Sequence, residues 1–155
     1  MEDTHGERDL EAAILRELAR FLLQLGTDFS FIARQKRMTI GDRDFYLDLF
    51  FYHRSLRRLV AVELKLGSFD AAYKGQMELY MRWLDRYERR PGEEPPIGLI
   101  LCGEKNREQI ELLQPDGRNQ CGGVPDGLPP REMLEAKLHQ AIRLAKGQVE
   151  GSSST

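Results

Sequence analysis

The sequence lacks any long apolar run, and it is poor in cysteine. Its 155 residues include two cysteines, Cys102 and Cys121, whose spacing does not match a metal-binding motif. No stretch approaches the roughly 20 apolar residues that a membrane-spanning helix needs. The first residues, MEDTHGERDLEAA, are too acidic and polar for a secretory signal. These absences predict a cytoplasmic chain with reduced thiols and no membrane partner.

An excess of basic residues is also missing. The chain carries 23 Lys and Arg against 25 Asp and Glu, a formal net charge of −2. A freestanding nucleic-acid-binding domain usually has a basic excess, so this balance argues mildly against one. The basic residues nevertheless gather in three groups: Arg34, Lys36 and Arg37; Arg54, Arg57 and Arg58; and Arg82, Arg86, Arg89 and Arg90. The groups fit either a local basic surface or ordinary solvated faces.

What the sequence does contain is a mixture of helical and strand patterns that fits one α/β domain. The expected elements are a helix over 8–25, strands over 31–39, 44–52 and 59–66, a helix over 70–89, a strand over 97–102, a short helix over 105–113 and a helix over 130–148. The first three strands should pair antiparallel through hairpins, and the helix after them permits a parallel fourth strand. Residues 114–129 are rich in glycine and proline and predict a loop or a disordered segment, and 149–155 predict a flexible tail.

Charged residues interrupt two of the apolar strands. Asp48 lies within the run DFYLDLFFY, and Glu63 and Lys65 lie two residues apart on one face of the next strand. An acid inside a hydrophobic strand costs free energy unless it has a partner. If the two strands form a hairpin, Asp48 can share a surface with Glu63 and Lys65.

Two carboxylates and an ammonium at neighbouring strand ends suggest a metal site. Mg²⁺ prefers oxygen ligands and commonly binds one or two protein carboxylates together with substrate phosphate. Asp48, Glu63 and the backbone carbonyl of Leu64 are the candidate ligands. Lys65 would orient or deprotonate a water, or balance developing phosphate charge. Two other interpretations stay open: an ordinary surface ion pair between Glu63 and Lys65, and a structural Asp48 that accepts hydrogen bonds from a turn.

The same residues resemble a known family. Asp48, the hairpin, the Glu63-Leu64-Lys65 triplet and a following helix with Gln76 are similar to the PDDEXK nuclease superfamily, and more closely to YhcG-type PDDEXK nuclease domains. The segments that carry the resemblance are GDRDFYLDLFFYHRSLRRLVAVELKLGSF, YKGQMELYMRWLD and PPIGLILCGEKN. The resemblance implies a restriction-endonuclease-like αβββαβ core over 1–113. It also implies Mg²⁺- or Mn²⁺-dependent cleavage of nucleic acid, with DNA as the expected substrate.

The resemblance also implies a role for individual residues. Asp48 and Glu63 match the family's metal ligands, and Lys65 completes the catalytic set. Gln76 and Tyr80 match a Q-x-x-x-Y element that supports the site and contacts DNA, although a helix face packed on the sheet explains them equally well.

On the first helix, Glu11 matches the position of an additional acid, with Glu17 as a competitor; a solvated helix acid is the simpler explanation for either. Four basic residues are expected to contact nucleic acid: Arg34, Lys36, Arg54 and Lys74.

Some features depart from the family pattern. Leu47 stands where the superfamily name has proline. Relatives carry an N-terminal helical or winged-helix-like domain that is not part of this sequence, and they usually continue into another strand after Leu113. A homodimer, or a partner protein that supplies a DNA-binding domain, is therefore expected.

Three functions fit these observations. The first is a metal-dependent nuclease, which the complete set of Asp48, Glu63 and Lys65 favours. The second is a non-catalytic nucleic-acid-binding or assembly module that retains the nuclease fold, which the acidic balance favours. The third is a dimerisation module that uses the C-terminal helix.

Overall fold

The fold was obtained as a computed structural model, which describes residues 4–24, 28–104, 107–114 and 128–152. The elements in chain order are α1 (Thr4–Gln24), β1 (Phe29–Ile40), β2 (Arg43–His53), β3 (Arg58–Leu66), α2 (Ala72–Tyr87), β4 (Glu94–Glu104), β5 (Arg107–Leu113) and α3 (Arg131–Ser152). Most of the predicted loop over 114–129 lies outside the described residues. Helix α3 continues to Ser152, into the segment expected to be a tail.

The strands form one five-stranded sheet in the order β1-β2-β3-β4-β5. Strands β1, β2 and β3 pair antiparallel through two hairpins, and β4 pairs parallel with β3 after the α2 crossover. This arrangement confirms the α/β fold with a mixed sheet and an αβββαβ core.

One predicted element was wrong. The segment 107–113 is not a helix but strand β5, which pairs antiparallel with β4 from Gly98↔Leu113 to Glu104↔Arg107. Its glutamates, glutamine and leucines favour a helix locally. The alternation of the strand instead buries Ile110 on one face of the sheet and Leu113 on the other, and this tertiary burial outweighs local propensity.

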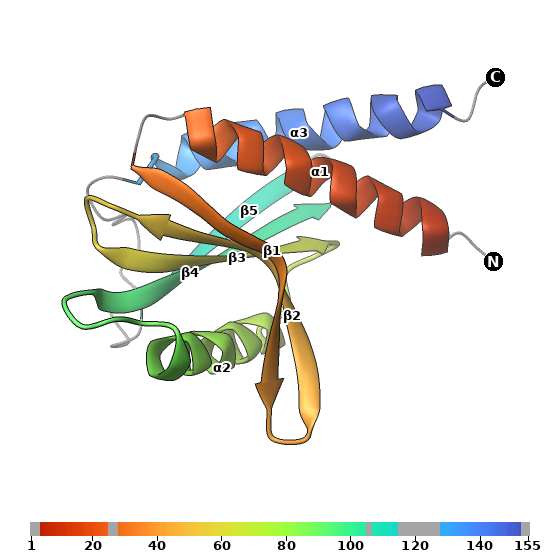
Figure 1. Ribbon diagram of the computed structural model, residues 1–155. Coiled ribbons are helices and arrows are strands. Elements are labelled where there is room, and N and C mark those ends of the chain that lie inside the picture. Colours follow the sequence, from red (N-terminus) through yellow and green to blue (C-terminus); the bar gives the residue numbers. More distant parts are fainter. Residues whose placement is uncertain (1–3, 25–27, 105–106, 115–127, 153–155) are drawn as a thin grey trace.

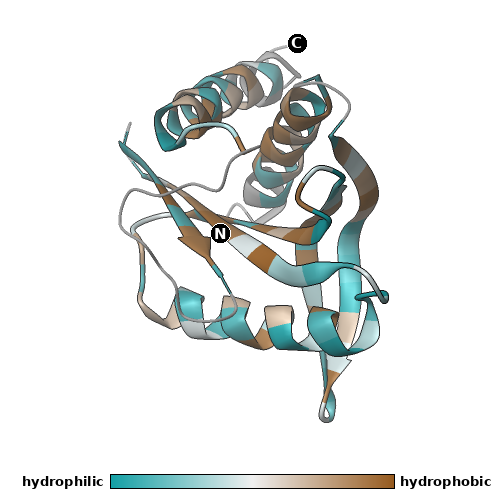
Figure 2. Cartoon of the chain, turned by 90° about the vertical axis from the view of Figure 1, so that its left-hand side faces the viewer, coloured by the Kyte–Doolittle hydropathy of each residue, from teal (hydrophilic) through white to brown (hydrophobic). Residues whose placement is uncertain are grey.

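The helices form layers on the two sides of the sheet (Figure 1). Helices α1 and α3 pack on each other and on one face, around buried residues such as Ile14, Leu18, Val62 and Leu138. Helix α2 covers the other face with Met77, Tyr80, Met81 and Leu84. Figure 2 shows the hydrophobic residues of the strands enclosed between these layers. Among the described helices, none is long and apolar enough to span a membrane.

Helix α2 packs closely on the sheet at Gly98 of β4. A Cβ atom built at this position would lie 2.6 Å from Cγ and 2.8 Å from Sδ of Met77. Because that spacing is shorter than a van der Waals contact, glycine lets the helix lie flat against the sheet here.

The β1–β2 hairpin is longer than its attachment to the sheet. Strands β1 and β2 pair from Phe29↔His53 to Ile40↔Arg43, whereas β2 pairs with β3 only from Leu49↔Val62 to His53↔Arg58. Over residues 43–48 of β2 and the paired part of β1, the hairpin leaves the sheet and extends past the end of α2 (Figure 1). There the Trp83 indole Nε1 donates a hydrogen bond to the Thr39 carbonyl at 3.0 Å. The separation of β2 from β3 creates a fork, and the charged residues of interest lie in it.

Candidate active site

The fork begins immediately after the last β2–β3 pair. The Asp48 N–H donates a hydrogen bond to Oε1 of Glu63 at 2.8 Å, and the Leu64 N–H donates to Oδ2 of Asp48 at 2.9 Å. Each carboxylate thus accepts the hydrogen bond that a backbone carbonyl would accept if β2 and β3 were still paired here. The structure therefore brings Asp48 and Glu63 together in one place, as the hairpin interpretation required.

Gln35 on β1 completes the arrangement around Asp48. Its Nε2 donates to Oδ1 of Asp48 at 2.9 Å, so both carboxylate oxygens of Asp48 accept a hydrogen bond. The backbone of Gln35 has a φ of 54°, a strained value for a residue other than glycine. Sequence reasoning missed this residue. Only the register of β1 and β2, with Arg34↔Leu49 and Lys36↔Leu47, sets Gln35 opposite Asp48.

Lys65 places its ammonium beside the two acids. Its Nζ lies 3.8 Å from Oε2 of Glu63 and 4.9 Å from the centre of the Tyr73 ring. Glu63 is only 6% exposed. A buried carboxylate that also accepts a backbone hydrogen bond is not one half of an ordinary surface ion pair, so that interpretation does not fit.

Burial raises the pKa of both acids, and the charge of Asp48 adds to the rise at Glu63. The pKa of Glu63 is raised to about 8, chiefly by burial and next by the charge of Asp48, while the Asp48 N–H and Lys65 oppose the shift. Burial also raises the pKa of Asp48, against the hydrogen bonds from Leu64 and Gln35. Two adjacent acids that resist losing their protons form a setting in which a cation would be strongly favoured.

Helix α2 supplies an apolar wall to the site through Tyr80. This side chain is 2% exposed and packs edge-to-face on Phe45. Burial, followed by the charges of Glu63 and Asp48, raises the pKa of Tyr80 to about 12, so its hydroxyl stays protonated. Gln76 lies one helical turn earlier and is partly buried. Within the described residues it makes no hydrogen bond to either acid.

The two candidate acids of α1 lie in different surroundings. Glu11 is close enough for its charge to contribute to the raised pKa of Glu63. Glu17 instead faces Arg20, with 3.6 Å between Oε2 and Nη1. The described part of the chain holds no group of three or more Asp, Glu, His or Cys residues suited to a metal ion. Glu11 is therefore near the site without being placed as a direct ligand.

The four predicted nucleic-acid contacts are scattered. Lys36 pairs with Glu88 at 3.0 Å, and Lys74 pairs with Glu111 at 3.7 Å. Arg54 follows the far end of β2, six residues and roughly 20 Å along the strand from Asp48. Arg34 is exposed and directly precedes Gln35. Arg34 is thus the one of these four that lies beside the fork without an ion pair among the described residues.

The donor set fits a hard divalent cation. Asp48 and Glu63 offer carboxylate oxygens in a largely buried setting, as Mg²⁺ and Mn²⁺ prefer. The N–H and C=O of one strand residue point to the same side. Because the Leu64 N–H points to Asp48, the Leu64 carbonyl also faces the fork. One or two protein carboxylates with water and substrate phosphate is a common set for Mg²⁺.

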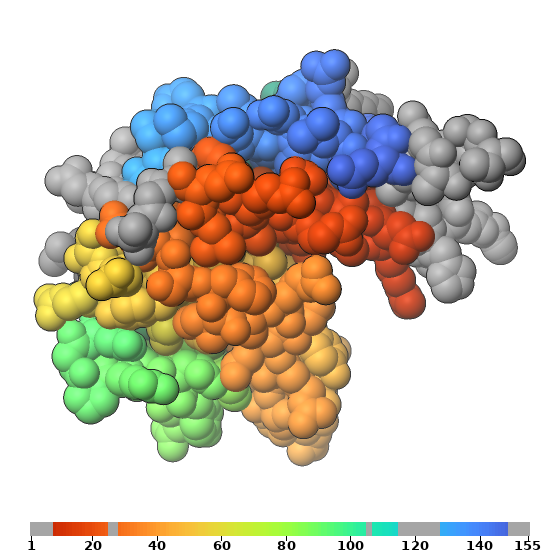
Figure 3. Space-filling view, turned by 45° about the horizontal axis from the view of Figure 1, so that its top comes forward, coloured from red at the N-terminus to blue at the C-terminus, as the bar shows by residue number. Residues whose placement is uncertain are grey.

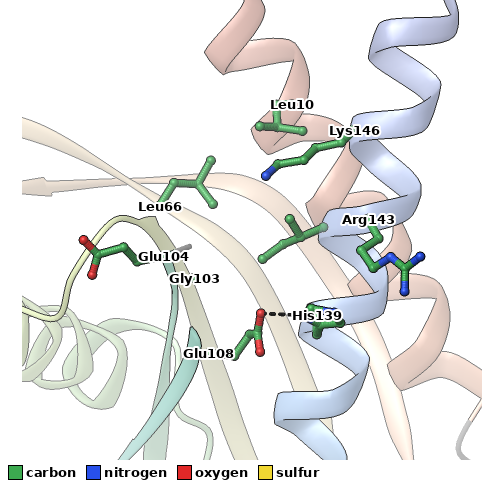
Figure 4. Close-up of a pocket in the computed structure, with 9 residues that line it drawn as sticks. Leu10, Leu66, Gly103, Glu104, Glu108, His139, Arg143 and Lys146 are labelled. Atoms are coloured by element: carbon green, nitrogen blue, oxygen red, sulfur yellow. Dashed lines mark hydrogen bonds and ion pairs between the residues drawn. The ribbon is translucent and has the colours of Figure 1, made fainter. Parts of the chain in front are cut away.

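A separate cavity of about 510 Å³ lies between α3, the start of α1 and the ends of β3 and β4 (Figure 4). On one side, Nδ1 of His139 lies 2.8 Å from Oε2 of Glu108 and connects α3 to β5. The cavity lining includes Leu66 and Ile142, which belong to the α1–α3 side of the sheet. Lys65 instead meets Tyr73 of α2. The cavity therefore belongs to the packing of α3 and not to the fork.

An α/β sheet with two acids and a lysine at the fork of its central strands defines a nuclease-type domain of the PDDEXK class. A sequence profile described as the YhcG PDDEXK nuclease domain matches residues 1–123, and the chain belongs to this family. Over 105 residues it is 45% identical to the Escherichia coli (strain K12) protein named "Putative nuclease YhcG".

That match covers 68% of this chain but only 28% of the Escherichia coli protein, so the chain spans little more than a quarter of its curated relative. Among solved structures, one titled "Crystal structure of SSO0001" aligns with 94% of this chain and 60% of its own, at a TM-score of 0.38 and 13% identity. A likeness this weak has no bearing on the site.

Proposed function

We propose that this domain is a metal-dependent nuclease that hydrolyses phosphodiester bonds of nucleic acid, with DNA as its substrate. The observation that carries the proposal is the joined and buried pair Asp48 and Glu63, with the Lys65 ammonium 3.8 Å from Glu63. Membership of a nuclease-domain family supports a nuclease-type function at the coarser level. Mg²⁺ or Mn²⁺ as cofactor and DNA as substrate are the finer parts of the proposal.

Asp48, Glu63 and the Leu64 carbonyl would hold the cation. A bound Mg²⁺ or Mn²⁺ supplies Lewis-acid polarisation of the phosphate and a water of lowered pKa. Gln35 and the Leu64 N–H fix the orientation of the Asp48 carboxylate before substrate arrives. Pre-oriented groups do not have to be ordered during the reaction, which lowers its barrier.

Lys65 and Tyr80 would act on the substrate side of the site. The Lys65 ammonium can donate to a non-bridging phosphate oxygen, where negative charge grows in the transition state. Its side chain is 26% exposed, so it can reach the solvent side of the fork. Tyr80 keeps one wall of the site dry, which strengthens the electrostatic interactions inside it.

Cleavage assays with isosteric variants test this proposal. Purified protein is incubated with plasmid, single-stranded DNA and RNA in Mg²⁺, Mn²⁺ or EDTA. We expect cutting only with the metal, and a loss of at least about a hundredfold in Asp48→Asn, Glu63→Gln and Lys65→Ala. Glu17→Gln, which removes a carboxylate of α1 paired with Arg20, is the matched control and should cut normally. Cutting that persists in all three site variants would identify a contaminating enzyme.

Binding of Mn²⁺ provides a readout that does not depend on activity. Electron paramagnetic resonance of free Mn²⁺ should show uptake by the wild-type chain and by Glu17→Gln, and none by Asp48→Asn or Glu63→Gln. Uptake by all four proteins would contradict the assigned ligands. Salt-sensitive binding of DNA without cleavage in any metal would instead support the non-catalytic module.

A further inference from the structure

A groove runs between α1 and β1 on the α1 side of the sheet. It encloses about 740 Å³ and has an apolar floor that includes Leu23, Phe31 and Leu49. Leu23 and Phe31 are 41% and 46% exposed, so both leave apolar surface open to solvent in the same groove. In the space-filling view, α1 and the β1–β2 hairpin lie side by side on this face (Figure 3). We refer to it as the α1–β1 groove.

Phe31 is held in place instead of projecting freely. Its ring packs edge-to-face on Phe51, with 5.7 Å between the ring centres. Phe51 itself is fully buried in the core. Phe31 therefore combines a fixed orientation with an exposed surface in the groove, which is the property that a stacking platform needs.

Arginines line the same groove. Arg16 and Arg20 come from α1, and Arg34 comes from β1. Arg16 and Arg34 are exposed and form no ion pair among the described residues. Arg20 has one partner, Glu17, and its side chain is 63% exposed. Arg16 and Arg20 are one helical turn apart, about 6 Å, a spacing that neighbouring phosphates of an extended strand can match.

The groove borders the strands that form the fork. Arg34 precedes Gln35, whose side chain binds Asp48, and Leu49 in the groove floor follows Asp48 in β2. Because neighbouring strand residues face opposite sides of a sheet, the groove lies on the α1 side of the hairpin and Asp48 faces the α2 side. Arginines in the groove would also offset the repulsion that the nearby acids exert on a phosphate chain.

We propose that the α1–β1 groove binds a single strand of nucleic acid on the α1 side of the hairpin that carries Asp48, a proposal that rests on the proposed nuclease function. Arg16 and Arg34 hold phosphates, and Phe31 stacks against a base. An apolar floor favours a single strand because its bases are exposed. A duplex presents phosphate and sugar on the outside and would leave the floor without a partner.

Fluorescence anisotropy of a fluorescein-labelled oligothymidylate in EDTA tests the groove without cleavage. The double variant Arg16→Ala/Arg34→Ala should bind at least about tenfold more weakly, and the slope of log affinity against log salt should fall by about 1.4, or 0.7 for each lost phosphate contact. Phe31→Ala should bind at least about fivefold more weakly with an unchanged salt slope, because stacking is not ionic. Circular dichroism should match the wild-type protein in both variants; the Tm should be unchanged in Arg16→Ala/Arg34→Ala and slightly lowered in Phe31→Ala, which loses the ring contact with Phe51.

Arg82→Ala is the control for loss of a positive charge outside the groove. This exposed arginine lies on α2, across the sheet from the groove, and its removal should change affinity less than twofold. An equal loss in Arg82→Ala would overturn the groove, because binding would then follow net charge alone. Unchanged affinity in Arg16→Ala/Arg34→Ala would also overturn it, in favour of a protein partner for the apolar floor. Tighter binding of blunt duplex competitor than of the single strand would overturn it as well.

The two proposals fail in different ways. If the wild-type chain cuts DNA and both groove variants bind and cut equally well, the groove is wrong and the nuclease stands. If the chain binds the oligonucleotide through the groove but never cuts, the groove stands as a binding site and the nuclease is wrong. If the chain neither binds nor cuts, both proposals are wrong.

Discussion

Over Leu49–His53, strand β2 is hydrogen-bonded to β3, and most of its side chains are fully buried; one residue earlier, at Asp48, that pairing stops. At this end, which we call the closed end, the backbone N–H and C=O groups of the two strands hydrogen-bond to one another. A carboxylate placed there would find no free hydrogen-bond donor. At the fork two backbone N–H groups lose their strand partners, and the carboxylates of Asp48 and Glu63 accept from them. The same two strands therefore exclude acids at one end and use them at the other.

This contrast shows that a structural role and the proposed catalytic role need not compete. The hydrogen bonds to Asp48 and Glu63 stabilise the fork, while burial raises the pKa of both acids and the charge of Asp48 raises that of Glu63 further. The two carboxylates stabilise the fork through their hydrogen bonds, and a cation between them would stabilise their charged forms. The variants below test each end of the comparison, beginning with the largest expected effect.

An acid moved into the closed end should be far more harmful than the acids of the fork. Val62 is fully buried one residue before Glu63. Val62→Asp should lower the free energy of unfolding by about 4 kcal/mol or more, because no donor is available for the new carboxylate. Val62→Ala, the control for lost volume, should cost about 2 kcal/mol. Equal losses in urea denaturation would mean that the fork has no special tolerance for acids.

The raised pKa of Glu63 should make the metal-free protein less stable at high pH. Between pH 4.5 and about 8 the folded state holds a proton that the unfolded chain has released. Stability in EDTA should therefore fall as pH rises through this window, by on the order of 2 to 4 kcal/mol. Glu63→Gln keeps an acceptor for the Asp48 N–H and cannot ionise, so its stability should vary less with pH.

Thermal unfolding at a series of pH values in EDTA measures this effect. Parallel curves for the wild-type protein and Glu63→Gln would contradict the raised pKa. Added Mn²⁺ should increase the Tm of the wild-type protein at pH 8, since a ligand that binds only the folded state stabilises it. The same addition should leave the Tm of Glu63→Gln unchanged.

Substitutions of Gln35 test how much its hydrogen bond to Asp48 stabilises the fork. Gln35→Ala removes the hydrogen bond to Asp48 and keeps the strained backbone, so it should cost about 1 kcal/mol. Gln35→Gly removes the same hydrogen bond but accepts a φ of 54° without strain. Chemical denaturation should therefore find Gln35→Gly more stable than Gln35→Ala. The reverse order would show that the strain at this position is negligible.

The smallest effect is expected where an acid has its partner near the surface, away from the fork. His139→Ala removes the pair with Glu108. The imidazole of His139 is 37% exposed. Exposed pairs contribute roughly 0.2 to 1 kcal/mol, so the Tm should fall by only a few degrees. DNA cleavage should be unaffected, which would confirm that the cavity beneath α3 is separate from the fork. A large loss of cleavage would connect the two.

The sequence predicted the helices, the first four strands and the coming together of Asp48 and Glu63. These features depend on local periodicity and on short hairpins, which a single chain displays directly. Strand β5 was read as a helix because its glutamates and leucines favour one. Ile110 and Leu112 lie on one face of the sheet and Leu113 lies on the other. This alternation favours a strand only when β5 is paired with β4, which the sequence alone does not show.

The details of the site depend on register and on departures from regular structure. Gln35 carries no motif, and its role follows from a positive φ and from its position opposite Asp48. Nor could the sequence distinguish Arg34 beside the fork from Arg54 at the far end of β2, because both belong to similar basic clusters. Such distinctions arise from where strands stop pairing, and residue types alone do not encode that point.

The close packing at Gly98 means that a residue without any functional group helps to set the position of one wall of the candidate site. A methyl group at this position would collide with Met77, so either the Met77 side chain or helix α2 would have to shift. Tyr80 lies on the same helix, one turn further along, and any shift of α2 would also move Tyr80 relative to the two acids. Water that entered behind the carboxylates would bring their pKa values back toward those of free side chains. A substitution in β4 can therefore alter the surroundings of acids that lie on the neighbouring strands.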